Sequence, residues 1–175
     1  MSNPTNKQSK FSNQKSSSEF YKILFQKIKI PFSPDYANIE DILYSKHLAS
    51  LGDALVNYCY SVARFAINPL LTSSVRVWDS SLATAIRQSP FNSYIKKRIS
   101  QGELGDCVEA IVAWTYMIGA ITLENIIEIL KQNLPQELLK NKKIEKDGAT
   151  FAFISLLEHL YSLDIFKSLL EKNNK

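Results

Sequence analysis

The sequence predicts an all-α protein with a single folded domain, and three observations support this class. Its 175 residues include only five glycines and six prolines, so few turns interrupt the chain. Runs of alternating polar and apolar residues, which would indicate strands, are scarce. Apolar residues recur instead at helical spacing through most of the chain after residue 19. A chain of this length buries roughly 70% of its unfolded surface on folding, so it needs no disulfide.

The N-terminal residues 1–19 consist mainly of Ser, Asn, Gln and Lys, and we expect a disordered polar arm there. This arm has the pattern of neither a secretory signal nor a transit peptide, so we expect a cytoplasmic protein. The helical domain is expected over residues 20–175, with an amphipathic first helix over 20–28 that Pro31 ends. Glu109 interrupts the longest uncharged run, which argues against a membrane span.

The second predicted helix begins after Asn38, which is expected to cap it. Glu40 and Asp41 follow the cap and stabilise the positive end of the helix dipole. From there apolar spacing continues to Ile67, as one long helix or two abutting ones, and Pro69 prevents any extension.

Shorter helices are predicted for the rest of the chain. The expected ranges are 79–86 capped by Asp79, 90–99 begun by Pro90, 104–118, a helix capped by Thr122, and a final one over 146–170. Phe151, Ile154 and Leu157 share a face of the final helix, so we expect this face to pack on the domain. Cys59 and Cys107 lie in apolar runs and are expected to be buried free thiols.

A Leu-Gly-Asp motif occurs twice, at residues 51–53 and 104–106, and each copy opens a run with hardly any charge. Asp53, Asp106 and Glu109 are therefore expected to be buried. Removing an ionised carboxylate from water costs several kcal/mol. Arg64 is the only base within the two runs and lies about three helical turns beyond Asp53. A cation shared by the acids is therefore a better explanation than ion pairs.

The spacing of the acids supports a shared cation. Asp106 and Glu109 lie three residues apart on one helix face, with Cβ atoms about 5–6 Å apart. Carboxylates this close repel each other unless a positive charge lies between them. Asn57 follows Asp53 by one turn and is the polar neighbour expected to support its side chain.

Glycines precede both aspartates, although glycine within a helix costs about 1 kcal/mol relative to alanine. We expect Gly52 and Gly105 to lie where two helix backbones approach closely, which would bring the acids together. The alternative provides no site, because Asp53 and Asp106 would then be helix N-caps bound to their own backbones.

Two strings, LGDALVN over residues 51–57 and KKRISQGELGDCVEAIVAWTYMIGA over 96–120, resemble the catalytic domain of the ribonuclease III family. The motifs of this family are a Leu-Gly-Asp helix and an Asp-x-x-Glu-Ala helix. The resemblance is strongest over residues 36–133, and the two motifs are specific only together. It is closest to stand-alone forms without a double-stranded-RNA-binding domain, such as mini-ribonuclease III and archaeal ribonuclease III-like proteins.

The resemblance implies a homodimeric endoribonuclease that hydrolyses phosphodiester bonds in double-stranded or structured RNA. It implies Mg²⁺ or Mn²⁺ as cofactor and products with 5′-phosphate and 3′-hydroxyl ends. It also implies Asp53 and Glu109 as catalytic residues and Asp53, Asp106 and Glu109 as metal ligands.

A basic run precedes the second motif, and the net charge of +4 favours a polyanionic partner. We expect Lys96, Lys97 and Arg98 to hold RNA phosphates near the metal site, in contacts that are independent of base sequence and sensitive to salt. Solvated surface charge is the alternative interpretation of this run.

The sequence also departs from the family pattern. The family usually has glutamates seven and four residues before the position of Asp53, where this chain has Lys46 and Ala49. Ser50 replaces a Phe that often docks into the partner subunit. With one ligand missing, a second Mg²⁺ should bind weakly or use water and RNA phosphate, unless Glu103 substitutes. The rival hypothesis is an RNA-binding or assembly protein of the same fold that has lost catalysis.

Overall fold

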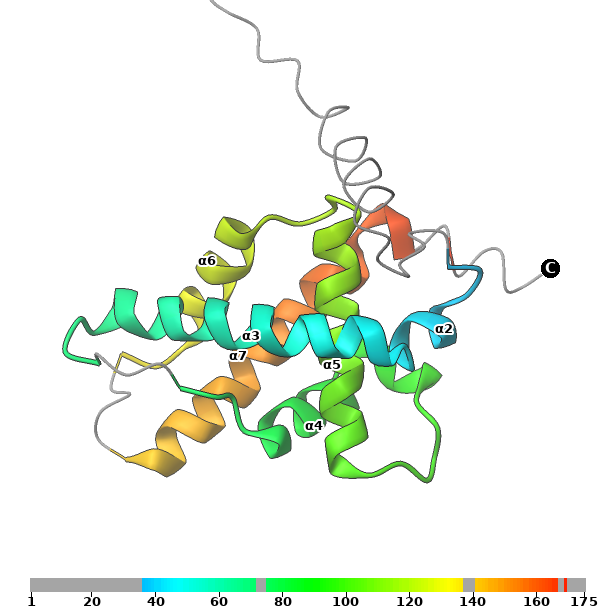
Figure 1. The fold of residues 1–175 in the computed structure, drawn as a ribbon. Helices are drawn as coiled ribbons and strands as arrows, with labels where there is room; N and C mark the ends of the chain where they lie inside the picture. The colour runs from blue at the N-terminus through cyan, green and yellow to red at the C-terminus, as the bar shows by residue number, and fades with distance from the viewer. Residues whose placement is uncertain (1–35, 72–74, 137–140, 167–168, 170–175) are drawn as a thin grey trace, which may run out of the picture. The chain divides into compact units, whose positions relative to one another are not determined.

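The computed structural model describes residues 36–71, 75–136, 141–166 and 169, all within one compact unit, Ser33–Lys175. Its elements are α2 (Ile39–Leu43), α3 (Lys46–Ile67), α4 (Asp79–Gln88), the 3-10 helix η1 (Pro90–Tyr94), α5 (Gln101–Met117), α6 (Leu123–Asn133) and α7 (Lys142–Ser162) (Figure 1). The described ranges contain no strand, which confirms the all-α prediction. The predicted arm over 1–19 and helix over 20–28 lie outside these ranges.

Helix α5 is the centre of the fold. Most of its residues are buried, and α2, α3 and α4 pack against it. Burial on all sides explains why α5 is apolar around its whole circumference. Near its C-terminal end, Trp114 contacts Phe166 edge to face with ring centroids 5.1 Å apart, and Phe91 of η1 contacts Phe166 in the same way at 5.0 Å.

The helix caps decide where the two Leu-Gly-Asp motifs lie. Ser45 caps α3, and its hydroxyl accepts a hydrogen bond from the backbone N–H of Leu48. The long apolar region therefore consists of two helices, α2 and α3. Ser100 and Glu103 form a reciprocal capping box at the start of α5. Both motifs are therefore inside helices, and the alternative that Asp53 and Asp106 are N-caps is wrong.

The predicted helix over 90–99 is wrong beyond Tyr94, where η1 ends. The backbone N–H of Lys96 donates to the Tyr44 hydroxyl at 2.9 Å, and the Lys96 carbonyl accepts from the Arg87 guanidinium at 3.3 Å. These side chains take up the backbone groups that a continuing helix would have used. The segment from Lys96 to the cap of α5 is consequently an exposed connection.

Two helix starts also differ from the prediction. Asp79 is the first residue of α4 rather than its cap, because Trp78 occupies the cap position. Helix α7 begins at Lys142, four residues early, because Asn141 caps it by accepting from the backbone N–H of Lys143 at 2.8 Å. The predicted caps Asn38 and Thr122 are confirmed.

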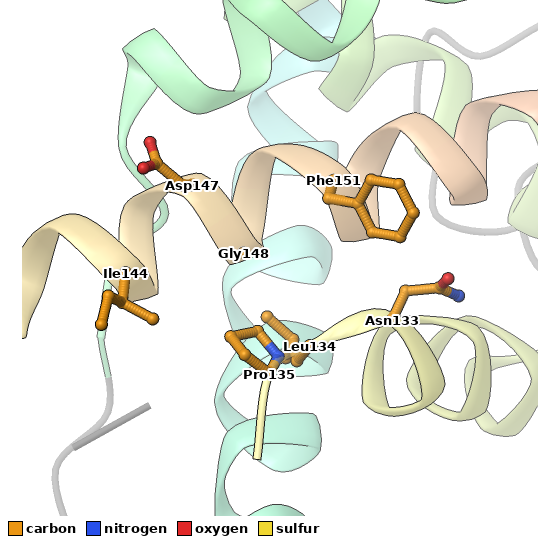
Figure 2. Close-up of a pocket in the computed structure, with 7 residues that line it drawn as sticks. All are labelled: Asn133, Leu134, Pro135, Ile144, Asp147, Gly148 and Phe151. Atoms are coloured by element: carbon orange, nitrogen blue, oxygen red, sulfur yellow. The ribbon is translucent and has the colours of Figure 1, made fainter. Parts of the chain in front are cut away.

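The N-terminal half of α7 is less buried than its apolar pattern predicts, and Phe151 is 58% exposed. Figure 2 shows Phe151 across a shallow pocket from the end of α6, with Leu134 and Pro135 at its base. Gly148 lets Pro135 lie directly against α7, since a Cβ at this glycine would overlap the proline ring.

Arg64, the one base within the two apolar runs, pairs with an acid on a different helix. The Arg64 Nε of α3 lies 2.6 Å from Glu145 Oε1 of α7, and both side chains are almost fully buried. The Arg64 guanidinium also lies over the Tyr60 ring at 5.8 Å from its centroid. Breaking such a buried pair leaves an uncompensated charge, so this contact holds α7 in register with α3.

Helices α3 and α5 cross each other (Figure 1), and the crossing depends on Gly52. A Cβ at this position would overlap the backbone carbonyl of Glu109, so only glycine permits this approach. This confirms the close approach predicted for Gly52. The same prediction is wrong for Gly105, where an added Cβ would meet only the Leu82 side chain of α4 at an ordinary 3.9 Å.

We expect Gly52→Ala to lower the free energy of unfolding by about 3 kcal/mol, because a backbone cannot yield as a side chain can. Chemical denaturation measures this change. Gly102→Ala is the matched control: it lies in the first turn of α5 with no atom within 4 Å of an added Cβ. Its stability should stay level or rise by up to about 1 kcal/mol. Equal effects of the two substitutions would contradict the proposed role of Gly52.

Candidate functional site

Glu109 lies at the crossing of α3 and α5 and is 8% exposed. Burial disfavours its charged form, and the negative charges of Asp53, Asp106 and Asp79 act in the same direction, against a smaller opposite effect of Arg76. Together they raise the pKa of the Glu109 carboxyl to about 7. At neutral pH this group therefore exchanges between its neutral and charged forms.

Asp53 and Asp106 are less buried than predicted. Their side chains are 41% and 38% exposed, and each contacts a base. Lys46 Nζ lies 2.6 Å from Asp106 Oδ2, and Arg76 Nη2 lies 3.2 Å from Asp53 Oδ1. The expectation of three buried acids without basic partners is thus wrong for two of them. Only Glu109 remains a buried carboxyl without a basic side chain bound to it in the described structure.

Asn57 fixes the geometry around Asp53. Its Nδ2 donates to Asp53 Oδ1 at 3.0 Å and to the Asp53 carbonyl at 2.7 Å, while its Oδ1 accepts from the Val77 N–H at 2.8 Å. Asn57 therefore ties α3 to the chain entering α4. Since Arg76 precedes Val77, the same contact brings Arg76 to the acid that it pairs with.

A pocket of about 190 Å³ lies beside Asp106 and is lined by Tyr44, Ser45, Lys46, Ala49, Lys96, Glu103, Leu43 and Asp106. It places Lys96 of the basic run near the second acidic motif, and the Lys96 ammonium lies 4.2 Å from the centroid of the Tyr44 ring. The Glu103 carboxylate accepts from the Ser100 N–H and hydroxyl. Both hydrogen bonds go to its Oε2 atom, so Glu103 could act as a substitute metal ligand only through Oε1 unless it left this cap.

The basic run lies on the connection between η1 and α5, and Lys96, Lys97 and Arg98 are all exposed. Lys96 is anchored through its backbone to Tyr44 and Arg87. Lys96 is therefore held in the pocket beside Asp106, and the exposed cationic groups of the run can contact a polyanion.

The donor chemistry of the acids suits a hard divalent cation, which prefers carboxylate oxygens. The raised pKa of Glu109 also reflects negative charge that the neighbouring bases do not neutralise. Within the described part of the chain, however, no three His, Cys, Asp or Glu side chains form a group that could hold a metal ion. Asp53 and Asp106 instead face Arg76 and Lys46.

Sequence reasoning missed Lys46 and Arg76 as partners of the acids. Lys46 lies seven residues before Asp53, or two helical turns, so helical spacing could have indicated that it points to the same side of α3. Arg76 lies on the loop before α4, and no spacing in the sequence indicates its contact with Asp53.

Comparison with protein-family models finds a match to the family described as Ribonuclease III over residues 46–163. The match begins at the first residue of α3 and includes all of α7. Comparison with curated proteins finds no significant match. Among the residues that the structure describes, no helix is long and apolar enough to cross a membrane.

The pKa of Glu109 predicts how stability depends on pH in metal-free buffer. Between about pH 4.5 and 7 the native state holds a proton that the unfolded chain has lost, so the free energy of unfolding should fall as pH rises through this window. Glu109→Gln should abolish this fall and exceed the wild type at pH 8 by roughly 3 kcal/mol.

Denaturation at pH 5, 6, 7 and 8 with EDTA measures this dependence. Glu158→Gln is the control, because Glu158 is exposed on α7 and its removal should leave the slope unchanged. A wild-type stability that is constant or rises over this range would contradict the raised pKa of Glu109.

Proposed function

The chain belongs to the ribonuclease III family, and we propose that it is a divalent-metal-dependent endoribonuclease acting on double-stranded or structured RNA. One observation carries this proposal: at the crossing of α3 and α5, the buried Glu109 carboxyl is affected by the negative charges of Asp53 on α3 and of Asp106 on its own helix. Acids gathered at a helix crossing are costly unless a cation offsets their repulsion.

In this proposal Asp53 and Glu109 hold the ion and Asp106 lies beside them. A divalent ion supplies charge that lowers the pKa of an attacking water and stabilises the leaving oxygen. Asn57 orients the Asp53 carboxylate through its hydrogen bond to Oδ1. Gly52 allows the close approach of α3 and α5 that brings Glu109 opposite Asp53.

The basic run supports RNA as the substrate. Lys96, Lys97 and Arg98 lead directly into α5, and their exposed cationic groups can bind phosphates on either side of the scissile bond. Contacts to phosphate fix the position of a duplex without selecting its base sequence. We therefore expect binding to depend on RNA shape more than on sequence.

The second candidate function is RNA binding or assembly without catalysis. The ion pairs Lys46–Asp106 and Arg76–Asp53 favour it, because they neutralise two acids without any metal. The family position of a glutamate ligand is Ala49 here, which points the same way. In this case the acids and bases together would act as a structural charge network.

Cleavage of long double-stranded RNA in Mg²⁺ or Mn²⁺ separates the two functions. We expect the wild type to produce fragments with 5′-phosphate ends, and Asp53→Asn or Glu109→Gln to reduce the rate by at least about a hundredfold while retaining RNA binding. Asp41→Asn, which changes an exposed acid of α2, should leave the rate unchanged. RNA binding without cleavage by the wild type would leave the binding protein as the function.

The salt dependence of RNA binding tests the basic run. Replacing Lys96, Lys97 and Arg98 with Gln should weaken binding and reduce the slope of log affinity against log salt by up to about 2.7. The control replaces Lys142, Lys143 and Lys146 of α7 with Gln, which removes the same net charge elsewhere. Equal losses in the two triple variants would show that net charge, and not this run, determines RNA affinity.

The outer face of α3 supports a homodimer. Leu51, Tyr58 and Phe65 are 42%, 56% and 52% exposed, and they are spaced by seven residues, so they form one apolar stripe. A stripe with this period is typical of a helix that packs against another helix. We propose that a second copy of the chain covers it, in place of the family contact that Ser50 lacks.

Light scattering after gel filtration tests this contact. The wild type should elute as a dimer, and Tyr58→Glu as a monomer, because a buried charge in the stripe is costly. Phe151→Glu changes an equally exposed aromatic residue on α7 and should remain dimeric. A dimer that survives Tyr58→Glu would place the interface elsewhere.

A further inference from the structure

We propose that the ammonium group of Lys46 takes the place of a divalent ion at Asp106, so that the chain binds one ion, held by Asp53 and Glu109. The inference rests on the proposed metal-dependent function and specifies how many ions this site accepts. It follows from an ion pair, from the charges on either side of Glu109, and from the anchoring of Lys46.

The ammonium group of Lys46 binds the Asp106 carboxylate directly. The two charged atoms are 2.6 Å apart, so the ammonium donates a direct charge-assisted hydrogen bond to the carboxylate. A metal ion bound to the same carboxylate would lie only a few ångströms from the ammonium, and like charges at about 4 Å repel by about 1 kcal/mol per unit charge product even in water. The lysine and an ion therefore compete for Asp106.

The charges differ on the two sides of Glu109. The pocket beside Asp106 contains two carboxylates, of Asp106 and Glu103, and two ammonium groups, of Lys46 and Lys96, so its charge is already balanced. The other side has fewer bases than acids: Arg76 pairs with Asp53, while Asp79 and the buried Glu109 carboxyl lie near enough to interact, which leaves an excess of negative charge. A divalent ion is attracted to that side.

The carboxylate of Asp53 also remains open to an ion. Arg76 and Asn57 both contact its Oδ1 atom, which leaves Oδ2 as a possible metal ligand. Asp53 directly follows Gly52, at the point where the backbone of α3 lies against that of Glu109. These two acids are therefore the pair whose repulsion one ion relieves most.

Lys46 is held close to Asp106 by the fold. Lys46 is the first residue of α3, directly after the Ser45 cap. Six residues further along, the close contact between Gly52 and the Glu109 backbone fixes the position of α3 against α5. A cation tethered in this way has a high effective concentration at its partner, while a free ion must be drawn from solution. This tethering favours the binding of Lys46 over that of a free ion at Asp106.

Titration of the full chain with Mn²⁺, followed by the electron paramagnetic resonance signal of free Mn²⁺ and by calorimetry, counts bound ions without any activity assay. We expect one ion per chain in the wild type. Lys46→Met should bind two, the second at least about tenfold more tightly than any second site of the wild type. Lys46→Arg keeps the positive charge and should bind one.

Lys131→Met is the matched control, because Lys131 also pairs with an acid, Glu128, but on α6. It should bind one ion, like the wild type. Two ions in the wild type, or no gain in Lys46→Met, would overturn the inference and leave metal-dependent cleavage standing. No ion in any variant would overturn the inference together with the proposed metal site.

Discussion

The close approach of α3 and α5 at Gly52 is the constraint on which the rest of the site depends. The glycine has no Cβ, so the backbone of Glu109 can lie directly against it. This contact brings the acid of one motif opposite the acid of the other, although 53 residues separate Asp53 from Asp106 in the sequence. A larger residue at Gly52 would move two helices and every charged group that they carry.

The same close approach gathers negative charges that the neighbouring bases neutralise only in part. Asp53 and Asp106 each contact an exposed base, and at such exposure these pairs contribute little to stability. Glu109 is different, because its carboxyl is buried and its pKa is raised to about 7. The fold thus tolerates a buried carboxyl that a nearby positive charge would ionise.

Much of the fold could be predicted from local sequence signals. Asn38, Thr122 and the Leu-Gly-Asp spacing act over a few residues, so helices and the crossing at Gly52 follow from them. Lys46 and Arg76 could not be assigned as partners of the acids, because those contacts join different elements and depend on tertiary packing. The exposure of Phe151 could not be predicted for the same reason. Periodicity shows which side of a helix is apolar, but it does not show whether another element covers that side.

Membership in the ribonuclease III family indicates the general class of function. The charges near Glu109 determine how this chain could perform that function. The most direct measurement is the anomalous diffraction of a crystal soaked in Mn²⁺, at a pH above the pKa of Glu109. We predict one strong peak, bound by the carboxylates of Asp53 and Glu109, with Lys46 still paired to Asp106. The absence of a peak there, or a peak bound by Asp106 in place of Lys46, would contradict this arrangement.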